Sequence, residues 1–202
     1  MSVRGRFVVL LGPDGCGKSS VLAGVSRALV DDFAGVEARH FRPQARWGTG
    51  VAVERPHALP PRSGPASVLK LALDFVRFRA GHRRWVRPAV RRGWLVIFDR
   101  YYHDLLADPR RYRYGGPAWL ARWVGRRVPA PDLFVVLDAP AELLQARKAE
   151  VAPAESAAAR QAYLALAGTL PRARVVDGAR PLNCVVAEVA ALVRGGGDGV
   201  TR

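Results

Sequence analysis

The chain has few of the features that mark secreted or membrane proteins. Only two of its 202 residues are cysteine, which is too few for a disulfide framework and fits a reducing compartment. No apolar run approaches the length of a membrane span, and the short polar start does not resemble a signal peptide. We therefore expect a cytoplasmic protein with no membrane partner.

Lysine is also scarce, because only Lys18, Lys70 and Lys148 occur among 32 basic residues, and the other 29 are arginine. With 17 acidic residues the net charge is +15. This surplus would concentrate an anionic partner around the protein, and arginine is the better bidentate ligand of phosphate. A protein that handles polyphosphates explains the charge about as well as one that binds nucleic acid.

The apolar pattern predicts strands that alternate with helices. Five stretches read as strands: 6–11, 36–41, 94–98, 132–138 and 174–176. Helical patterns begin near residues 18, 66, 85, 117, 140, 152 and 181. This alternation indicates an α/β fold, a three-layer sandwich of about five parallel strands with helices on both faces. We expect one domain over residues 1–194, a flexible tail at 195–202, and the functional site at the carboxyl ends of the strands.

The first predicted strand leads into the sequence Gly-Pro-Asp-Gly-Cys-Gly-Lys-Ser at residues 12–19, which fits the pattern G-x-x-x-x-G-K-[ST] of a phosphate-binding P-loop. Glycines let backbone N–H groups point at phosphate oxygens, the lysine reaches the β- and γ-phosphates, and the serine binds Mg²⁺. Lys18 is thus a candidate catalytic residue and Ser19 a metal ligand. Nucleotide contacts are expected from Gly12, Asp14, Gly15, Cys16, Gly17, Lys18, Ser19 and Ser20. A plain glycine-rich turn is the alternative.

Charged residues follow the third and fourth predicted strands. Asp99 suits a carboxylate that holds Mg²⁺, or one that caps the next turn. Arg100 would bridge the phosphates of both substrates, or pair with a nearby carboxylate. Asp138 would join the metal site or, slightly favoured, cap the helix that begins at Pro140.

Other candidates have open interpretations. Arg147, together with Lys148, suits a lid over the nucleotide or an ordinary solvated helix face. His103 suits packing or a substrate contact rather than acid–base chemistry, since phosphoryl transfer needs no strong base. The glycine- and proline-rich stretch 44–65 is a long loop, functional or mobile. The arginine- and tyrosine-rich run 110–114 would stack on bases or cover the substrate cleft.

Together these residues resemble the thymidylate kinase family of P-loop nucleoside monophosphate kinases. Residues 12–19 are similar to its G-x-D-G-x-G-K-[ST] loop, and Asp99-Arg100-Tyr101 to its D-R-[YH] signature. Residues 131–140 resemble its P-D-L…L-D-x-P strand, and 176–182 its I-D-A-x-x-P-[LI] stretch near the adenine. The likeness is collinear over nearly the whole chain. It implies ATP-dependent transfer of phosphate to a nucleoside monophosphate, thymidylate being the first candidate, with ATP and Mg²⁺ as cofactors.

The resemblance also implies roles for single residues. Asp14 would contact the sugar of the acceptor or the metal region, and Arg100 and Tyr101 would contact the substrate. Arg42, followed by Pro43, looks like a remnant of an R-E-P motif that binds the acceptor phosphate. Phe75 and Arg79 have the spacing of a base-stacking phenylalanine and a phosphate-binding arginine, although their distance to Pro88 is one residue short. Cys16 stands where some members have an arginine, which fits the variant whose catalytic arginines, here Arg147, sit in the lid.

The departures from the family pattern all fall on the acceptor side. Glu is missing between Arg42 and Pro43, the Gly-Gly-Thr that usually follows is absent, and Tyr102-His103-Asp104 replace small hydroxyl residues. A kinase of the same fold that acts on a non-nucleotide acceptor, such as a sugar, is therefore an alternative. A basic P-loop protein that binds nucleic acid is a second. We expect a small-molecule acceptor rather than nucleic acid, and leave a homodimer open.

Overall fold

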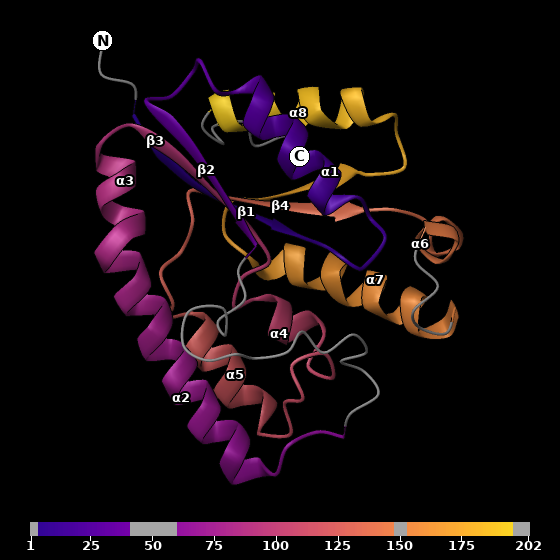
Figure 1. Cartoon of the computed structure of the whole chain (residues 1–202). Coiled ribbons are helices and arrows are strands. Elements are labelled where there is room, and N and C mark those ends of the chain that lie inside the picture. Colours follow the sequence, from indigo (N-terminus) through magenta and orange to yellow (C-terminus); the bar gives the residue numbers. More distant parts are fainter. Residues whose placement is uncertain (1–3, 41–59, 148–152, 196–202) are drawn as a thin grey trace.

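The computed structural model describes residues 4–40, 60–147 and 153–195. Its centre is a sheet of five parallel strands in the order β2-β3-β1-β4-β5 (Figure 1). The strands are β1 (Arg6–Leu11), β2 (Gly35–His40), β3 (Trp94–Asp99), β4 (Leu133–Asp138) and β5 (Ala173–Asp177). All five predicted strands are confirmed, and no strand end differs from its predicted position by more than one residue.

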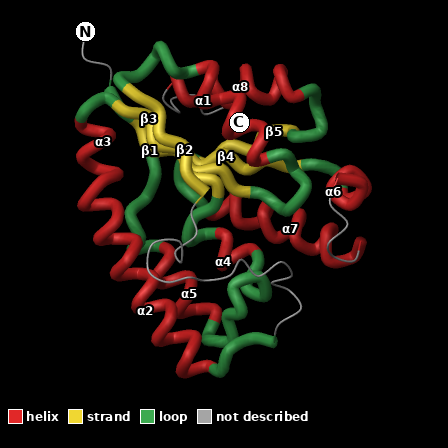
Figure 2. The backbone as a smooth tube through the Cα atoms, viewed as in Figure 1, coloured by secondary structure: helices red, strands yellow, loops and turns green. Residues whose placement is uncertain are grey.

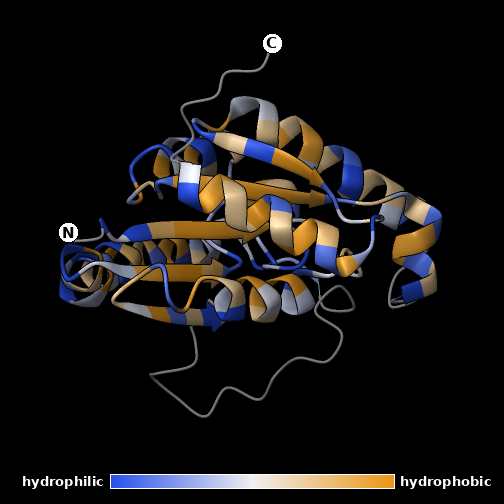
Figure 3. Cartoon of the chain, turned by 90° about the horizontal axis from the view of Figure 1, so that it is seen from above, coloured by the Kyte–Doolittle hydropathy of each residue, from blue (hydrophilic) through white to orange (hydrophobic). Residues whose placement is uncertain are grey.

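The strands β1, β3 and β4 are apolar on both faces because helices cover the sheet on both sides. In β1, the side chains of Phe7 and Val9 pack into one core and those of Val8 and Leu10 into the other. This follows from the period of two residues along a strand. Figure 3 shows the strands as mainly hydrophobic, with hydrophilic residues concentrated toward the outside.

The helices form the two outer layers of the predicted three-layer sandwich, as Figures 1 and 2 show. On one face, α1 (Lys18–Ala28) and α8 (Leu182–Gly195) pack on each other and on the sheet. The other face is covered by α2 (Gly64–Gly81), α4 (Asp104–Ala107), α5 (Ala118–Gly125) and α7 (Pro153–Thr169). The short α6 (Ala141–Arg147) follows β4 and packs against α7.

The helix that begins at Gly64 continues almost to β3 through a π-helical turn. This turn, His82–Val86, joins α2 to α3 (Arg87–Arg91), and the Arg87 N–H donates to the His82 carbonyl five residues back. The sequence predicts that Pro88 kinks or restarts the helix, and the wider turn lies just before it, because proline cannot donate the usual hydrogen bond.

Some expectations about loops and ends need revision. The sequence predicts a loop over 104–116, but residues 104–107 form α4, whose first turn is held by the Asp104 carboxylate accepting the Tyr101 N–H at 2.7 Å. Helix α8 reaches Gly195, one residue into the expected tail, while 196–202 lie outside the described residues. Most of the 44–65 stretch also lies outside them. None of the described helices combines the length and hydrophobicity that crossing a membrane requires.

Candidate active site

The loop between β1 and α1 has the backbone of a phosphate cradle. Gly12, Gly15 and Gly17 have φ values of 143°, 86° and 91°, in the left-handed region that favours glycine. At Gly15 the constraint is also steric, since an added Cβ would lie 2.6 Å from the carbonyl oxygen of Leu144. Gly17 is the N-cap of α1, so the positive end of this helix opens onto the loop.

Lys18 lies inside this loop rather than in solvent. It is buried, and its Nζ donates to the carbonyl oxygens of Gly12 and Pro13 at 2.8 and 2.7 Å and to the Cys16 sulfur at 3.4 Å. Its charge is therefore already positioned at the loop. The Cys16 side chain is only 1% exposed and belongs to the core beneath α1, so phosphate contacts from this residue would have to come from its backbone.

The expected metal and nucleotide residues surround the same loop. Ser19 and Ser20 are exposed in the first turn of α1. Asp99 is buried at the end of β3, in register with Leu10 of β1, and so lies beside the strand that leads into the loop. Within the described ranges no three His, Cys, Asp or Glu residues form a metal cluster. Mg²⁺ in phosphate sites is commonly held by one or two protein ligands together with substrate phosphates and water.

Arg147 reaches the loop from the end of α6. Its Nη1 donates to the carbonyl of Gly178 at 3.2 Å and lies 3.9 Å from where a Cβ of Gly17 would be. Gly178 is itself close to the loop, because a Cβ there would come within 2.9 Å of the Cys16 carbonyl oxygen. The structure thus brings Arg147 and the 176–182 stretch to the P-loop, on the side where the resemblance places the adenine.

A cluster of charges occupies the other side of the loop. Asp14 forms ion pairs with two arginines, Arg100 through Oδ1 and Arg111 through Oδ2. Burial acts to raise the pKa of Asp14, but the positive charges of Arg100, Arg111 and Lys18 outweigh it and hold the pKa below its ordinary value. Asp14 is therefore ionised whenever these residues are together at neutral pH.

Arg100 is tied to a second carboxylate behind it. Its Nη1 lies 3.4 Å from Oδ1 of Asp104, which is completely buried and also accepts the hydroxyl of Tyr163 at 2.7 Å. Burial acts to lower the pKa of Arg100, but Asp104 and Asp14 raise it on balance, so the guanidinium stays charged. Burial raises the pKa of Asp104, against the opposing effects of Arg100 and of the Tyr163 and Tyr101 donors, and its carboxyl group holds Arg100 from behind.

The backbone of Arg100 is unusual for a residue that is not glycine. Its φ is 74°, and its N–H donates to the carbonyl of Leu10 at 3.0 Å, which joins it to the end of β1. Such conformations cost roughly 1–3 kcal/mol and are concentrated at functional sites. The strain aims the Arg100 side chain across the end of β1 toward Asp14.

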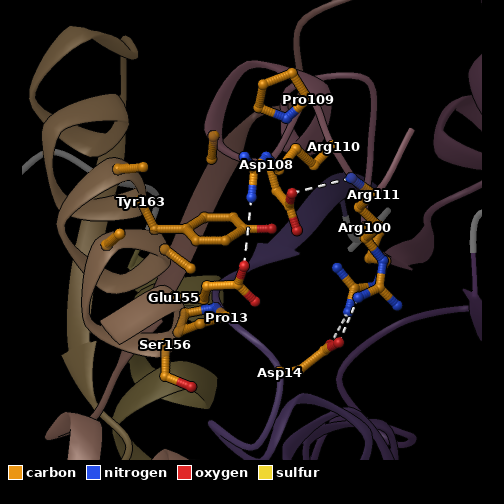
Figure 4. A pocket seen from close by; sticks show the side chains of 14 residues that line it. Pro13, Asp14, Arg100, Asp108, Pro109, Arg110, Arg111, Glu155, Ser156 and Tyr163 are labelled. Carbon is orange, nitrogen blue, oxygen red and sulfur yellow. Dashed lines mark hydrogen bonds and ion pairs between the residues drawn. The ribbon is translucent and has the colours of Figure 1, made fainter. Parts of the chain in front are cut away.

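These charged residues form one end of a pocket of about 390 Å³ between the P-loop and α7 (Figure 4). Fourteen residues line it: Pro13, Asp14, Arg100, Ala107, Asp108, Pro109, Arg110, Arg111, Glu155, Ser156, Ala158, Ala159, Ala162 and Tyr163. The wall that α7 contributes consists mainly of small side chains. Run 110–114 therefore helps to enclose the cleft, as one of its two interpretations proposes, and its residues Arg110 and Arg111 face the pocket.

Three predicted substrate residues do not line this pocket. Tyr101 is buried, with its hydroxyl donating to the Pro129 carbonyl at 2.7 Å. The Arg79 guanidinium lies 5.6 Å from the centre of the Phe75 ring and donates to the Arg127 carbonyl at 3.3 Å, at the end of α5. In the described structure these residues thus stabilise the packing of α2 and of the 101–103 segment. Arg42 lies outside the described residues.

Two further candidates have structural roles. Asp138 forms a bidentate ion pair, because its two oxygens accept Nε and Nη2 of Arg160 at 2.7 and 2.8 Å. Neither interpretation of Asp138 anticipates this bidentate pair with an arginine. His103 is buried against Phe134, with ring centroids 4.8 Å apart, and burial lowers its pKa to about 4. The packing role expected for His103 is confirmed.

Sequence reasoning missed several residues that shape the site. Arg111, Asp104, Tyr163 and Arg160 were not singled out, because each one acquires its role from a residue far away in the chain. Asp104 offered one signal, as an acidic residue in an otherwise apolar and aromatic stretch after the Asp-Arg-Tyr signature. Arg111 offered only its membership in an arginine-rich run.

The parallel sheet and this loop define a P-loop NTPase fold. No protein-family model matches the chain. It is 34% identical to thymidylate kinase of Leifsonia xyli subsp. xyli over 199 residues, 92% of each chain, and 35% identical to that of Clavibacter michiganensis subsp. michiganensis, over 94% of this chain and 93% of that one. The chain belongs to the thymidylate kinase family. Its fold is similar to the crystal structure of thymidylate kinase from Ehrlichia chaffeensis, with a TM-score of 0.61 and 17% identity over 94% of this chain and 98% of that one.

Proposed function

We propose that the protein transfers the γ-phosphate of ATP to dTMP, which gives dTDP and ADP. The observation that carries this proposal is the position of Asp14. This residue belongs to the P-loop, yet its carboxylate lies between Arg100 and Arg111 at the end of a pocket of about 390 Å³. A donor site for polyphosphate and a cationic site for an acceptor therefore adjoin, as in-line phosphoryl transfer requires.

The residues present fit ATP and Mg²⁺. Three P-loop glycines have the positive φ values that let the loop turn its N–H groups toward a phosphate, and Lys18 supplies a buried positive charge. We assign Mg²⁺ binding to Ser19 and Asp99 and nucleotide binding to residues 12–20. Arg147 would lie on the adenine side of this nucleotide site. When bound, Mg²⁺ would neutralise charge on the phosphates. Lys18 and Arg100 would stabilise the negative charge of the transferring group, and Asp14 would orient Arg100 and Arg111.

The departures from the family pattern around residues 42–65 and 102–104 concern how the acceptor is recognised. We infer that the base and sugar of dTMP lie in the pocket along α7, where alanines leave room, with the phosphate toward the arginines. Pockets of this size are common for small ligands. Arg42 stays a proposed acceptor residue, beyond the described part of the chain.

A product-resolved assay tests the proposal. The purified chain is incubated with Mg-ATP and, in parallel, dTMP, other nucleoside monophosphates, thymidine and a neutral sugar, and the products are separated. We expect dTDP from dTMP and far less product from thymidine. Efficient phosphorylation of the sugar, with none of dTMP, would overturn the proposal in favour of a non-nucleotide kinase.

We also propose that the protein forms a homodimer. The outer face of α2 exposes Leu69, Leu73 and Val76, by 63%, 48% and 63%, at positions three and four residues apart. Residues at this spacing lie on one face of a helix, and an apolar face of this kind suits packing against another helix. Sedimentation of the chain and of a Leu69→Lys, Val76→Lys variant tests this, and a monomeric chain in both cases would contradict it.

A further inference from the structure

We propose that Arg111 is a second anion-binding residue of the acceptor site, and that it binds the phosphate group of the acceptor together with Arg100. The inference rests on the proposed function in one respect only, the choice of dTMP as the phosphate-bearing acceptor. The arrangement of Arg111, Asp14 and Arg100 itself suits any phosphate monoester.

The first argument is the way the two arginines share one carboxylate. Arg100 contacts one oxygen of Asp14 and Arg111 contacts the other, although the two arginines come from different loops. Their guanidinium groups therefore flank a space that already holds one oxyanion group. A phosphate has the same need for donors on separate oxygens, and bidentate arginine contacts suit it particularly well.

The charge of the cluster is the second argument. Lys18, Arg100 and Arg111 are positive and Asp14 is negative, while burial raises the pKa of the second carboxyl group, Asp104, so positive charge is left over. Asp104 holds Arg100 from behind, and the Nε of Arg100 is buried without a hydrogen-bond acceptor in the described part of the chain. Asp14 therefore balances the surrounding positive charge only in part, and a phosphate dianion that enters the pocket would be attracted.

The loop also holds Arg111 in place before any ligand arrives. The N–H of Arg111 donates to Oδ1 of Asp108 at 3.1 Å, and the N–H of Tyr114 donates to the carbonyl of Pro109 at 2.9 Å. The Arg111 side chain is 20% exposed, so it can be reached from the pocket. Residues ordered in this way lose little conformational freedom on binding, which favours affinity.

The neighbouring arginine provides an internal comparison. Arg110 lines the same pocket and carries the same charge, but its side chain is 75% exposed and pairs with Glu155 at the edge formed by α7. In Figure 4 the Arg110–Glu155 pair lies apart from the Arg100–Asp14 pair. Exposed ion pairs contribute little because water and salt screen them. Arg110→Ala is therefore the matched control for Arg111→Ala.

The experiment measures steady-state kinetics of the full chain and its Arg111→Ala, Arg111→Lys and Arg110→Ala variants. We expect Arg111→Ala to raise the KM for dTMP about tenfold to a hundredfold, as removal of a charge-assisted contact does, and to change the KM for ATP less than about twofold. Arg111→Lys should fall in between, because it keeps the charge and loses the second donor. Arg110→Ala should raise the KM for dTMP less than Arg111→Ala does, because the Arg110 side chain is largely exposed and paired with Glu155.

A binding measurement separates anion recognition from a purely structural role. Calorimetry with dTMP, thymidine and inorganic phosphate is done with the P-loop occupied by Mg²⁺ and a non-hydrolysable ATP analogue. The preference for dTMP over thymidine should shrink in Arg111→Ala and persist in Arg110→Ala. If Arg111→Ala weakens dTMP and thymidine equally, or acts only by lowering the melting temperature, the inference is wrong and Arg111 is a structural latch.

The same measurements distinguish failure of the inference from failure of the proposed function. Turnover of dTMP with an unchanged KM in Arg111→Ala would overturn the inference and leave the function standing. If the wild type neither binds nor phosphorylates dTMP, the function is wrong. Inorganic phosphate then decides the inference: binding that depends on Arg111 supports it, and binding that does not, or no binding at all, refutes it.

Discussion

The two sides of the candidate active site are built in different ways. On the ATP side, residues 12–20 form the site from consecutive backbone groups and one lysine, with Arg147 added from α6. On the acceptor side, the site is made of side chains that come from distant parts of the chain, chiefly Asp14, Arg100, Arg111 and Tyr163. One side is local in sequence and the other is assembled by the fold.

This difference indicates which side of the active site tolerates changes in amino-acid sequence. A cradle of N–H groups needs glycine at given positions and leaves little choice. A cationic pocket needs guanidinium groups at the right place, and several loops can supply them. The motifs of the family are accordingly complete between residues 12 and 20, whereas the acceptor side departs from them after Tyr101.

The largest expected effect is on the ATP side. Lys18→Ala should lower turnover roughly a hundredfold or more, because it removes the buried positive charge at the transferring phosphate. Circular dichroism and thermal melting check that the variant folds. Lys70→Ala is the control, since this lysine pairs with Asp74 on α2, away from the pocket. A folded Lys18→Ala enzyme with near-normal turnover would remove Lys18 from the reaction.

The next effect separates backbone strain from steric contact within the P-loop. Gly15→Ala should raise the KM for ATP about tenfold, because the new Cβ meets the Leu144 carbonyl oxygen at 2.6 Å in addition to the strain of a φ of 86°. Gly17→Ala carries strain alone, since its nearest neighbour is Arg147 Nη1 at 3.9 Å. The KM for dTMP should change little in both. Equal effects of the two variants would show that strain alone controls the loop.

A smaller effect is expected behind the acceptor side. Tyr163→Phe removes a 2.7 Å hydrogen bond to the buried Asp104 and should cost about 1–3 kcal/mol of unfolding free energy. Because Asp104 orients Arg100, the KM for dTMP should rise severalfold while the KM for ATP stays constant. Tyr114→Phe is the matched control, as its hydroxyl donates to the carbonyl of Pro117 at 3.0 Å near the surface. A shift of both KM values in Tyr163→Phe would mean that the two sides are not independent.

The last prediction concerns stability alone. Burial lowers the pKa of His103 to about 4, so between this pH and its ordinary value of 6.5 the unfolded chain binds a proton that the folded chain does not. The His103 contribution to stability is therefore complete above pH 6.5 and is lost as pH falls toward 4, by about 3 kcal/mol at most. Denaturant unfolding across this range should show a flatter pH profile for His103→Phe. An unchanged profile would assign the acid sensitivity to other groups, such as His82, whose pKa is also lowered.

Much of the fold could be predicted because its signals are local. Each strand is a short apolar run, and the P-loop is a contiguous pattern between a strand and a helix, so neighbouring residues determine both. The parallel sheet follows from the alternation of strands and helices. For the turn at 82–86 the sequence indicates only that Pro88 kinks or restarts the helix, because the choice of a π-helical turn depends on packing.

Side-chain partnerships could not be predicted in the same way. Asp138 stands at a strand end, where caps and metal ligands are common, but Arg160 on α7 takes both its oxygens. The interaction joins residues 22 apart, and that between Asp14 and Arg111 joins residues 97 apart. Pairs with such large sequence separations leave no periodic pattern in the sequence from which they could be predicted.

The sequence by itself therefore determined the class of fold, the phosphate-binding loop and the excess of arginine from which an anion site can be made. Only the tertiary structure decided which of the 29 arginines meet Asp14, because the strained turn at Arg100 and the ordered loop before Arg111 bring two of them to the same carboxylate. Backbone hydrogen bonding and apolar burial act through near neighbours and can be seen in the order of residues. Charge pairs form between residues that only the fold brings together, so the partners of each charged residue are defined only once the fold is complete.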